Sequence, residues 1–183
     1  MPTSATATAT ATTASTYAPP QTGRYILDAP KSTITFATKH MFGLGRVRGR
    51  LAVTRGSVVI ADRPESSAVE AEISASSFST RNPLRDVQVR SGLFLSARRH
   101  PALSFRADGV RPREGRWSVT GTLTVKGVSA PVELIVTNIE HMGASTVFTA
   151  HGAVDRYAYG VKAMPGMAAR HLSFEITAHA TRA

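Results

Sequence analysis

The sequence predicts an all-β protein, an antiparallel sheet of about eight strands that closes into a barrel. The main observation is that apolar and polar residues alternate along most of the chain, as in strands with one dry face. Within residues 115–126, for example, one parity is apolar and carries Trp117, Val119, Leu123 and Val125. A second observation is that short turns, and almost no long helical patterns, separate the alternating segments. Closure of such a sheet removes the exposed edges that favour aggregation.

We expect a strand wherever this alternation continues over several residues. In chain order these strands are residues 24–27, 33–39, 46–54, 58–60, 68–75, 102–110, 116–126, 131–140, 146–154 and 171–181. Turns containing glycine are expected at residues 41–45, 113–115 and 126–129. Gly56 is expected to form a hairpin turn that leads into residues 58–60.

Two segments depart from the alternation. Residues 76–100 lose the period of two, and we expect short helical turns and loop there, with Val87 and Phe94 facing the same way. Residues 156–170 contain Tyr157, Tyr159, Gly160, Met164, Pro165 and Gly166, a composition typical of a loop. An aromatic-rich loop beside the mouth of a barrel is a candidate lid.

The length of 183 residues and a hydrophobic content of 42% suit one domain with a sizeable core. Residues 1–23 contain no charged side chain and begin with an Ala/Thr/Ser-rich stretch, so we expect a disordered leader followed by one domain over residues 24–183. The leader has no basic n-region and no continuous apolar h-region. No stretch approaches the ~20 apolar residues of a membrane span. We therefore expect a soluble, cytoplasmic protein.

The chain has no cysteine, which excludes disulfides, thiolate catalysis, cysteine zinc sites and iron–sulfur clusters. It has no HExxH motif, no phosphate-binding P-loop and no Gly-x-Ser-x-Gly elbow. The glycines of residues 43–49 precede a strand and not the helix N-terminus that a dinucleotide site requires. None of the six histidines has a tight metal-binding spacing. We therefore expect no metal and no cofactor.

A formal charge of +10 favours anionic partners such as phosphate head groups, a membrane surface or nucleic acid. The alternative is a soluble protein from an arginine-rich proteome. Arg46, Arg48 and Arg50 share one side of a strand, where they could bind phosphates or form a solvated face. Exposed aromatic residues do not alternate with these arginines, so we expect no specific nucleic-acid binding.

Four groups of residues, taken together, resemble the motifs of one family, the YceI-like proteins. The first is Asp28, Ser32, Ile34, Phe36 and His40, followed by Val47 and Gly49. The second is Arg85-Asp86, Ser91-Gly92-Leu93-Phe94 and His100-Pro101-Ala102-Leu103-Ser104-Phe105. The third is Gly121-x-Leu123-Thr124-Val125-Lys126-Gly127-Val128-Ser129-x-Pro131-Val132, and the fourth is Asp155-Arg156-x-x-Tyr159-Gly160.

This resemblance implies a lipocalin-like barrel that binds an isoprenoid lipid in its interior without catalysis, and it associates the chain with the stress response. The implied ligands are a polyprenol, a polyprenyl phosphate or an isoprenoid quinone. Three positions depart from the family pattern: Asp155 replaces Asn, Tyr159 replaces Phe, and Leu95-Ser96 replaces an aromatic residue followed by Asp. Many relatives also carry a secretory signal and are periplasmic or secreted, unlike the compartment expected for this chain.

The expected ligand-binding residues are the inward parity of the strands and two loop aromatics. They are Phe36, Leu51, Ile73, Phe94, Phe105, Trp117, Leu123, Phe148, Tyr159 and Phe174. These side chains could equally pack against one another and leave no cavity. At the mouth, His40, Asp86 and Arg156 are candidates for holding a head group, although Asp86 and Arg156 could instead form a structural ion pair.

Two other functions are consistent with the sequence. One is an enzyme acting on a small apolar substrate, with His40 and Asp86 as a proton-transfer pair. The other is a basic interaction module that uses the arginine row at residues 46–50. The sequence also leaves open a homodimer and contact with an anionic membrane surface.

Overall fold

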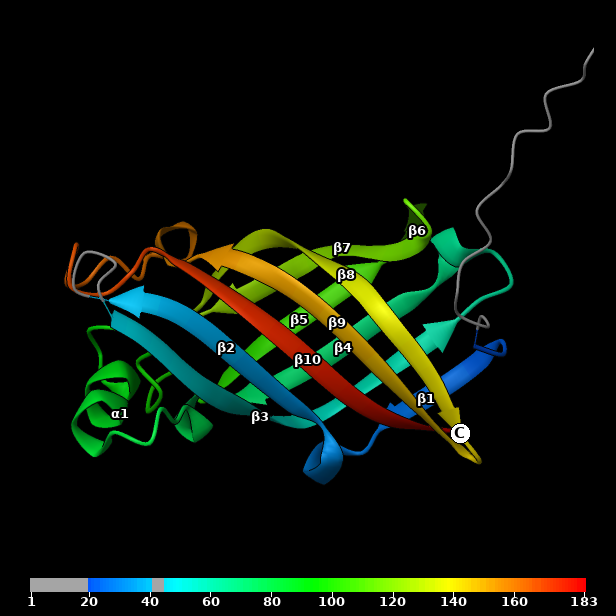
Figure 1. The fold of residues 1–183 in the computed structure, drawn as a ribbon, viewed down its shortest axis with the longest axis horizontal. Coiled ribbons are helices and arrows are strands. Elements are labelled where there is room, and N and C mark those ends of the chain that lie inside the picture. The colour runs from blue at the N-terminus through cyan, green and yellow to red at the C-terminus, as the bar shows by residue number, and fades with distance from the viewer. Residues whose placement is uncertain (1–19, 41–44) are drawn as a thin grey trace, which may run out of the picture.

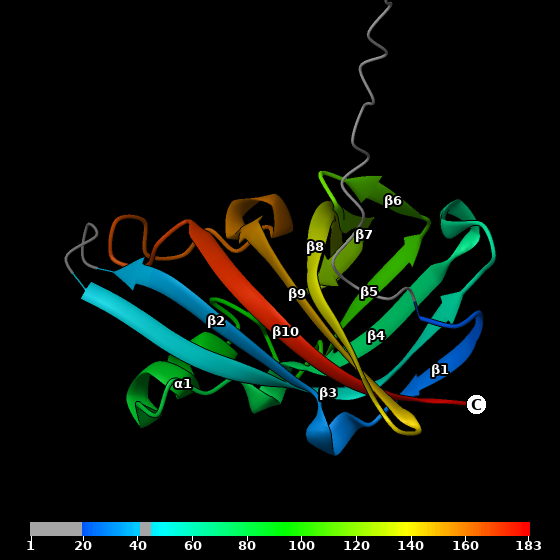
Figure 2. The same cartoon turned by 45° about the vertical axis from the view of Figure 1, so that its right-hand side comes forward.

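The computed structural model describes residues 20–40 and 45–183, and for Lys39 and His40 it describes the backbone alone. In this part of the chain ten strands form one antiparallel sheet, and eight of them close into a barrel. The predicted fold class is therefore confirmed. The barrel is elongated, with the helix α1 at one end and the short strand β6 at the other (Figures 1 and 2).

The strands are β1 (Gly23–Leu27), β2 (Thr33–His40), β3 (Gly45–Ile60), β4 (Ala68–Ser74), β5 (Ala102–Asp108), β6 (Val110–Arg113), β7 (Arg116–Val125), β8 (Val128–Met142), β9 (Ser145–Asp155) and β10 (His171–Arg182). The one α-helix in the described residues is α1 (Pro83–Arg90). Short 3-10 turns are η1 (Ala29–Lys31), η2 (Pro64–Ser66), η3 (Ala75–Ser77) and η4 (Arg156–Tyr159). The predicted leader up to residue 19, and residues 41–44 of the turn predicted at 41–45, lie outside the described residues.

Pairing between β9 and β10 closes the barrel, in a ladder that runs from Asp155 opposite His171 to Ser145 opposite Thr181. The strands around the barrel follow the order β10, β2, β3, β4, β5, β7, β8 and β9. β1 and β2 both pair with β10 and β3, and η1 separates them. These two short strands therefore act together as one position in the barrel wall.

β3 is one continuous strand, so the hairpin predicted at Gly56 is wrong. A bulge between Val53 and Arg55 shifts its register against β4 without ending the strand. A Cβ atom on Gly56 would lie 2.6 Å from Leu27 Cδ1 and 2.7 Å from the Glu70 carbonyl oxygen. Glycine is needed here because two neighbouring segments approach the backbone closely, and not because the chain turns.

A glycine does interrupt the strand predicted over residues 102–110. Gly109 has a φ of 116°, a value that residues with a Cβ rarely adopt. The chain therefore ends β5 at Asp108 and begins β6, which pairs with β7. The predicted turn at residues 113–115 is confirmed, with positive φ at Glu114 and Gly115.

The irregular segment 76–100 contains α1, whose first turn is capped by Asn82: its side chain accepts a hydrogen bond of 3.1 Å from the Arg85 amide. Val87 is 67% exposed and Phe94 is buried, so the prediction that they face the same way is wrong. The helix ends at Arg90, and the turn that follows carries Phe94 inward. No helix in the described residues is long and apolar enough to cross a bilayer.

The loop predicted at residues 156–170 is confirmed, apart from the short turn η4 at its start. Asp155 holds both of its ends. Its carboxylate accepts a hydrogen bond from the Tyr157 amide at 2.9 Å and from Arg170 Nε and Nη2 at 2.8 and 2.6 Å. The loop covers the same end of the barrel as α1 (Figure 1).

Replacement of Gly49 should destabilise the fold, because a Cβ there would lie 2.5 Å from the Ser79 carbonyl oxygen and closer still to the Phe36 ring. We expect Gly49→Ala to lower the free energy of unfolding by about 1–3 kcal/mol in a denaturant titration. Gly92→Ala is the control: a Cβ on Gly92 would meet no atom within 4 Å. Equal losses in the two variants would contradict this account.

Asp155 should make stability depend on pH in the acid range. The hydrogen bond from Arg170 lowers the pKa of this carboxyl from 3.8 to about 2. A lowered pKa stabilises the folded state above the ordinary pKa, and this contribution is lost as the pH falls through about 2. Asp155→Asn should therefore lower the melting temperature at neutral pH, and the difference from wild type should shrink as the pH falls below 4.

The control is Glu70→Gln, which removes an exposed carboxylate that lies 3.6 Å from Arg106 Nη1. This longer, exposed ion pair should contribute little at any pH. If the melting temperatures of wild type and Asp155→Asn differ by the same amount at every pH, the stability does not depend on ionisation of Asp155 and the prediction is wrong.

Candidate functional site

The barrel interior is hollow and not solid. It holds a larger lobe of about 390 Å³ and a smaller lobe of about 200 Å³. The two lobes are neighbours inside the barrel, and five side chains border both of them: Ile34, Ile73, Phe105, Leu134 and Ile176. The larger lobe alone falls within the range of about 300–1,000 Å³ that is usual for ligand pockets.

The larger lobe extends toward the end of the barrel that carries η2 and β6. Its wall is mainly aliphatic and aromatic, with Trp117 on β7 and Phe148 on β9 among its larger side chains. Polar residues such as Thr22 and Asp62 lie next to strand ends, on the rim of this lobe.

The smaller lobe lies at the end of the barrel that α1 covers. Strand residues form its sides, and non-strand residues close it. Those closing residues are Phe78, Val89, Phe94, Leu95, Tyr159 and Val161. Arg156 is the one ionisable side chain, besides the phenol of Tyr159, in this wall. A ligand there would meet almost no polar group.

All ten side chains predicted to bind a ligand line one of the two lobes. Trp117 and Phe148 line the larger lobe, and Ile73 and Phe105 line both. The smaller lobe takes the other six: Phe36, Leu51, Phe94, Leu123, Tyr159 and Phe174. That these residues bind a ligand stays a prediction.

Sequence reasoning missed two groups of lining residues. Leu134 and Ile176 lie on the inward parity of their strands, so the alternation that identified Phe174 could also have identified them. Phe78, Val89 and Leu95 belong to the aperiodic segment 76–100. This segment has no regular period, so the sequence does not indicate which of its side chains point inward.

Of the predicted head-group residues, Asp86 does not face the lobes and His40 cannot be placed. The side chain of His40 lies outside the described residues. Asp86 is buried but lines neither lobe. Its carboxylate accepts hydrogen bonds from the amide and hydroxyl of Thr80, at 2.8 and 2.7 Å. Burial raises the pKa of Asp86, but these hydrogen bonds outweigh it and the pKa falls below its ordinary value.

Arg156 is buried, and its guanidinium is largely occupied by the protein. Its nitrogens donate to the carbonyl oxygens of Val161, Ala168 and Ala169, at 2.7, 2.9 and 2.8 Å. The guanidinium carbon also lies 5.7 Å from the centre of the Phe94 ring. Desolvation lowers the pKa of Arg156 from its ordinary value, yet a guanidinium remains charged.

The ion pair between Asp86 and Arg156 that the sequence left open is not among the ion pairs of the described residues. Each residue instead holds its own loop. Asp86 holds residues 79–80 beside α1, and Arg156 holds the carbonyl groups of loop 156–170. These contacts satisfy backbone groups that irregular segments would otherwise leave unpaired.

Tyr159 is 3% exposed and lines the smaller lobe beside Phe94. Burial raises the pKa of its hydroxyl, so the group stays protonated at neutral pH and can donate a hydrogen bond. No hydrogen bond joins this hydroxyl to another of the described residues. The Tyr159 hydroxyl is therefore a donor with no partner among the described residues.

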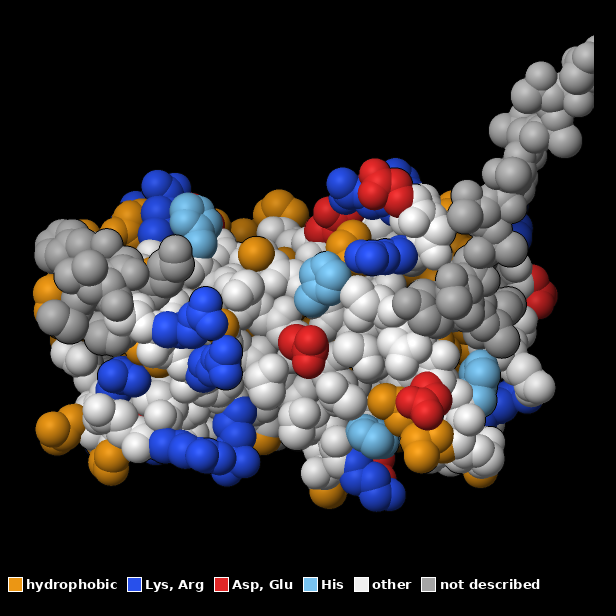
Figure 3. Space-filling view, in the orientation of Figure 1, with side chains coloured by type: hydrophobic (Ala, Val, Ile, Leu, Met, Phe, Trp, Pro, Cys, Tyr) orange, Lys and Arg blue, Asp and Glu red, His pale blue; other side chains and the backbone are white. Residues whose placement is uncertain are grey.

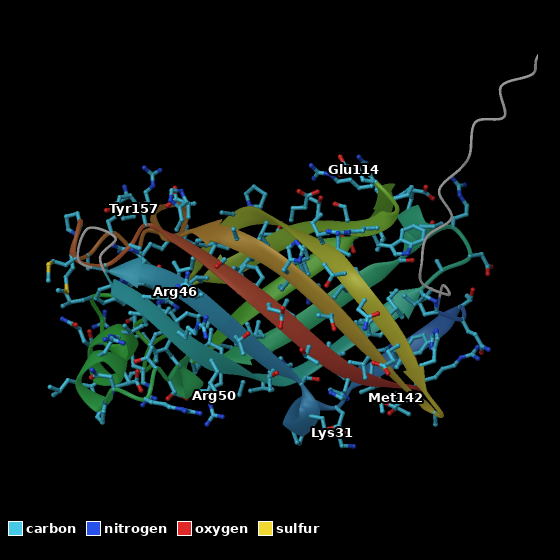
Figure 4. All side chains as sticks on the ribbon, viewed as in Figure 1. Lys31, Arg46, Arg50, Glu114, Met142 and Tyr157 are labelled. Carbon is cyan, nitrogen blue, oxygen red and sulfur yellow. The ribbon has the colours of Figure 1, made fainter. Side chains whose placement is uncertain are left out.

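The arginine row faces outward, as predicted. Arg46, Arg48 and Arg50 are exposed on β3, and Figure 4 shows Arg46 and Arg50 on the outer face of the barrel. Arg48, Arg50 and Arg81 border an outer hollow of about 990 Å³ that also contains Glu175. Phe36 and Phe174 line both this hollow and the smaller lobe. Within residues 20–40 and 45–183, no three metal-binding side chains come together.

Solved structures share this fold. BcnA of Burkholderia cenocepacia aligns with a TM-score of 0.73 at 21% identity, over 85% of this chain and 99% of that chain. A polyisoprenoid binding domain from Saccharophagus degradans aligns with a TM-score of 0.63 at 14% identity, over 87% and 98%. The YceI protein of Campylobacter jejuni gives 0.59 at 20% identity, over 72% and 83%.

Sequence relatives are UPF0312 proteins. One from Pseudomonas aeruginosa is 31% identical over 102 residues, and one from Pectobacterium atrosepticum is 30% identical over the same length. Each alignment covers 55% of this chain, and the chain spans about half of the relative's length, 53%. Residues 25–180 match the YceI-like domain, which is most of the chain. The resemblance stated from the motifs is confirmed: this chain belongs to the YceI-like family.

Proposed function

We propose that this protein binds and carries one apolar isoprenoid-type lipid inside the barrel, without catalysing a reaction on it. The observation that carries the proposal is the pair of neighbouring apolar lobes inside the barrel. The polyisoprenoid binding domain of Saccharophagus degradans, which shares the fold, supports the choice of ligand class. Membership of the YceI-like family supports it as well.

An isoprenoid tail fits the physical character of the site. The tail has no hydrogen-bonding group, so it requires only a dry cavity of suitable shape. Each buried methylene-sized unit contributes roughly 0.8 kcal/mol. Ordering of the flexible tail offsets part of this gain, but a long tail still leaves a net affinity.

The wall of the smaller lobe presents almost only apolar surface, and Tyr159 and Arg156 are the two side chains in it that carry polar groups. A head group at this end would require the Tyr159 hydroxyl, which can donate to a quinone carbonyl, an alcohol or a phosphate oxygen, to turn toward the lobe. The Arg156 guanidinium lies in the same wall and adds positive charge. Three of its donors already bind carbonyl groups, so Arg156 would act on the ligand mainly through its charge.

The non-catalytic part of the proposal rests on Asp86. An acid–base pair requires a carboxylate that reaches the substrate and has a pKa near the working pH. The Asp86 carboxylate binds Thr80, lines neither lobe and has a lowered pKa. It is therefore positioned to hold a loop and not to transfer a proton.

Purified protein should carry an extractable apolar lipid, seen as added mass by native mass spectrometry and identified after solvent extraction. Stripped protein should then take up a polyprenol or an isoprenoid quinone. Trp117 is the single tryptophan of the chain and lines the larger lobe, so its fluorescence should change with ligand. A bare mass, together with no change in fluorescence on adding either lipid, would refute the proposal.

Filling the larger lobe should block binding without unfolding the protein. Ala178 on β10 borders this lobe, and Ala178→Leu should weaken lipid binding at least tenfold, about 1.4 kcal/mol. Ala153→Leu is a matched control, because Ala153 is exposed on β9 and lines neither lobe. Fluorescence titration measures both affinities. Equal affinities in the two variants would place the ligand elsewhere.

A further inference from the structure

The end of the barrel that carries α1 is unusually apolar on its outer surface. The described residues include nine large hydrophobic side chains that are exposed, and six of them belong to α1, to the turns and loops next to it and to the first residue of β8. We call these six the α1-end surface: Leu84, Val87, Leu93, Val128, Met164 and Met167.

Contacts show that these segments are neighbours. Gln88 Nε2 of α1 lies 3.2 Å from Met164 Sδ, and Lys126 Nζ donates to the Gly92 carbonyl at 2.9 Å. A Cβ on Gly160 would lie 3.8 Å from Val128 Cγ2. Leu84 and Val87 are three residues apart on α1, so they project from the same side of the helix. They are 86% and 67% exposed, which is costly for side chains that contact only water.

The same end of the molecule is strongly basic. Residues 79–100 and 156–170 hold eight Arg or Lys residues and one acidic residue, Asp86, which is buried. Asp155, which directly precedes loop 156–170, is paired with Arg170. On the face shown in Figure 3, Lys and Arg gather over the half of the barrel next to α1, and Asp and Glu lie toward the middle and the other end. The arginine row of β3 extends this basic area.

The segments that carry this outer surface also close the cavity. Val89 of α1, Phe94 and Val161 line the smaller lobe from inside. Leu84, Val87 and Met164, from the same segments, point outward. A single thin layer of chain therefore separates the apolar cavity from an apolar and basic exterior.

We propose that the α1-end surface docks on an anionic lipid bilayer. Exposed aliphatic side chains enter the boundary between head groups and acyl chains, and arginines around them bind lipid phosphates. Charge complementarity selects this partner, because methionine, leucine and valine within a nearly carboxylate-free basic area match both parts of an anionic bilayer. The docking proposal rests on these exposed residues alone. If the docked end also exchanges lipid with the bilayer, that further step rests on the proposed function.

Site-specific labelling tests the orientation directly. The chain contains no cysteine, so Leu84→Cys and Met142→Cys can each carry one environment-sensitive fluorophore. Met142 is 58% exposed at the turn between β8 and β9, at the opposite end from α1 (Figure 4). With vesicles of equal phosphatidylcholine and phosphatidylglycerol, the Leu84→Cys label should shift to the blue and the Met142→Cys label should not. Equal responses at the two ends would overturn the proposal.

Vesicle sedimentation measures separately how much the apolar side chains and the arginines of this end contribute to membrane binding. Leu84→Asp with Val87→Asp should lower the partition coefficient at least about tenfold, because two exposed apolar anchors are lost. Met142→Asp is the control at the other end and should change little. Arg81→Gln with Arg85→Gln should lose about fivefold per arginine, whereas Arg111→Gln with Arg116→Gln, on the β6–β7 side, should lose much less. High salt and pure phosphatidylcholine should both weaken binding.

The vesicles contain no isoprenoid lipid, so this test does not depend on the barrel ligand. Docking without any lipid uptake would refute the proposed function and leave this inference intact. Uptake of lipid without binding to anionic vesicles would refute this inference and leave the proposed function intact. If the Leu84→Asp and Val87→Asp variant instead converts a dimer to a monomer while vesicle binding is unchanged, the surface joins two copies of the chain and the inference is wrong.

Discussion

The backbone pairing between β9 and β10 is the constraint on which the rest of the structure depends. Without it the sheet would have two edges, and its inner face would open to water. With it, every second side chain of eight strands is directed into one closed space. A barrel of eight strands is just wide enough either to be filled by side chains or to hold one slender ligand. In this chain the side chains leave two lobes unfilled.

Alternation in the sequence was enough to predict this closed sheet and the direction of its side chains. Trp117 and Phe174 line the cavity because strands have a strict period of two. The same rule could not interpret Gly56 or Gly109, because a glycine can serve close packing as well as a turn. Only the neighbouring atoms of Leu27 and Glu70 distinguish the two roles at Gly56.

Whether the barrel was hollow could not be predicted, because cavity volume depends on how residues from different strands meet. Ile34 and Leu134, for example, are 100 positions apart in the chain but lie in the same wall. Nor could the sequence orient Phe94, since its position follows from where α1 ends. The residue types of Asp86 and Arg156 suggested a head-group site, but Asp86 binds the amide and hydroxyl of Thr80, and Arg156 binds three loop carbonyl groups.

The five residues shared by the lobes have a consequence for which molecules can extend along the whole barrel. Ile34, Ile73, Phe105, Leu134 and Ile176 come from five different strands and border both lobes. A molecule that occupied both lobes would have to lie between these branched and aromatic side chains. Their spacing would then limit the thickness of such a molecule more strongly than its length, which favours a flexible chain over a rigid fused-ring compound.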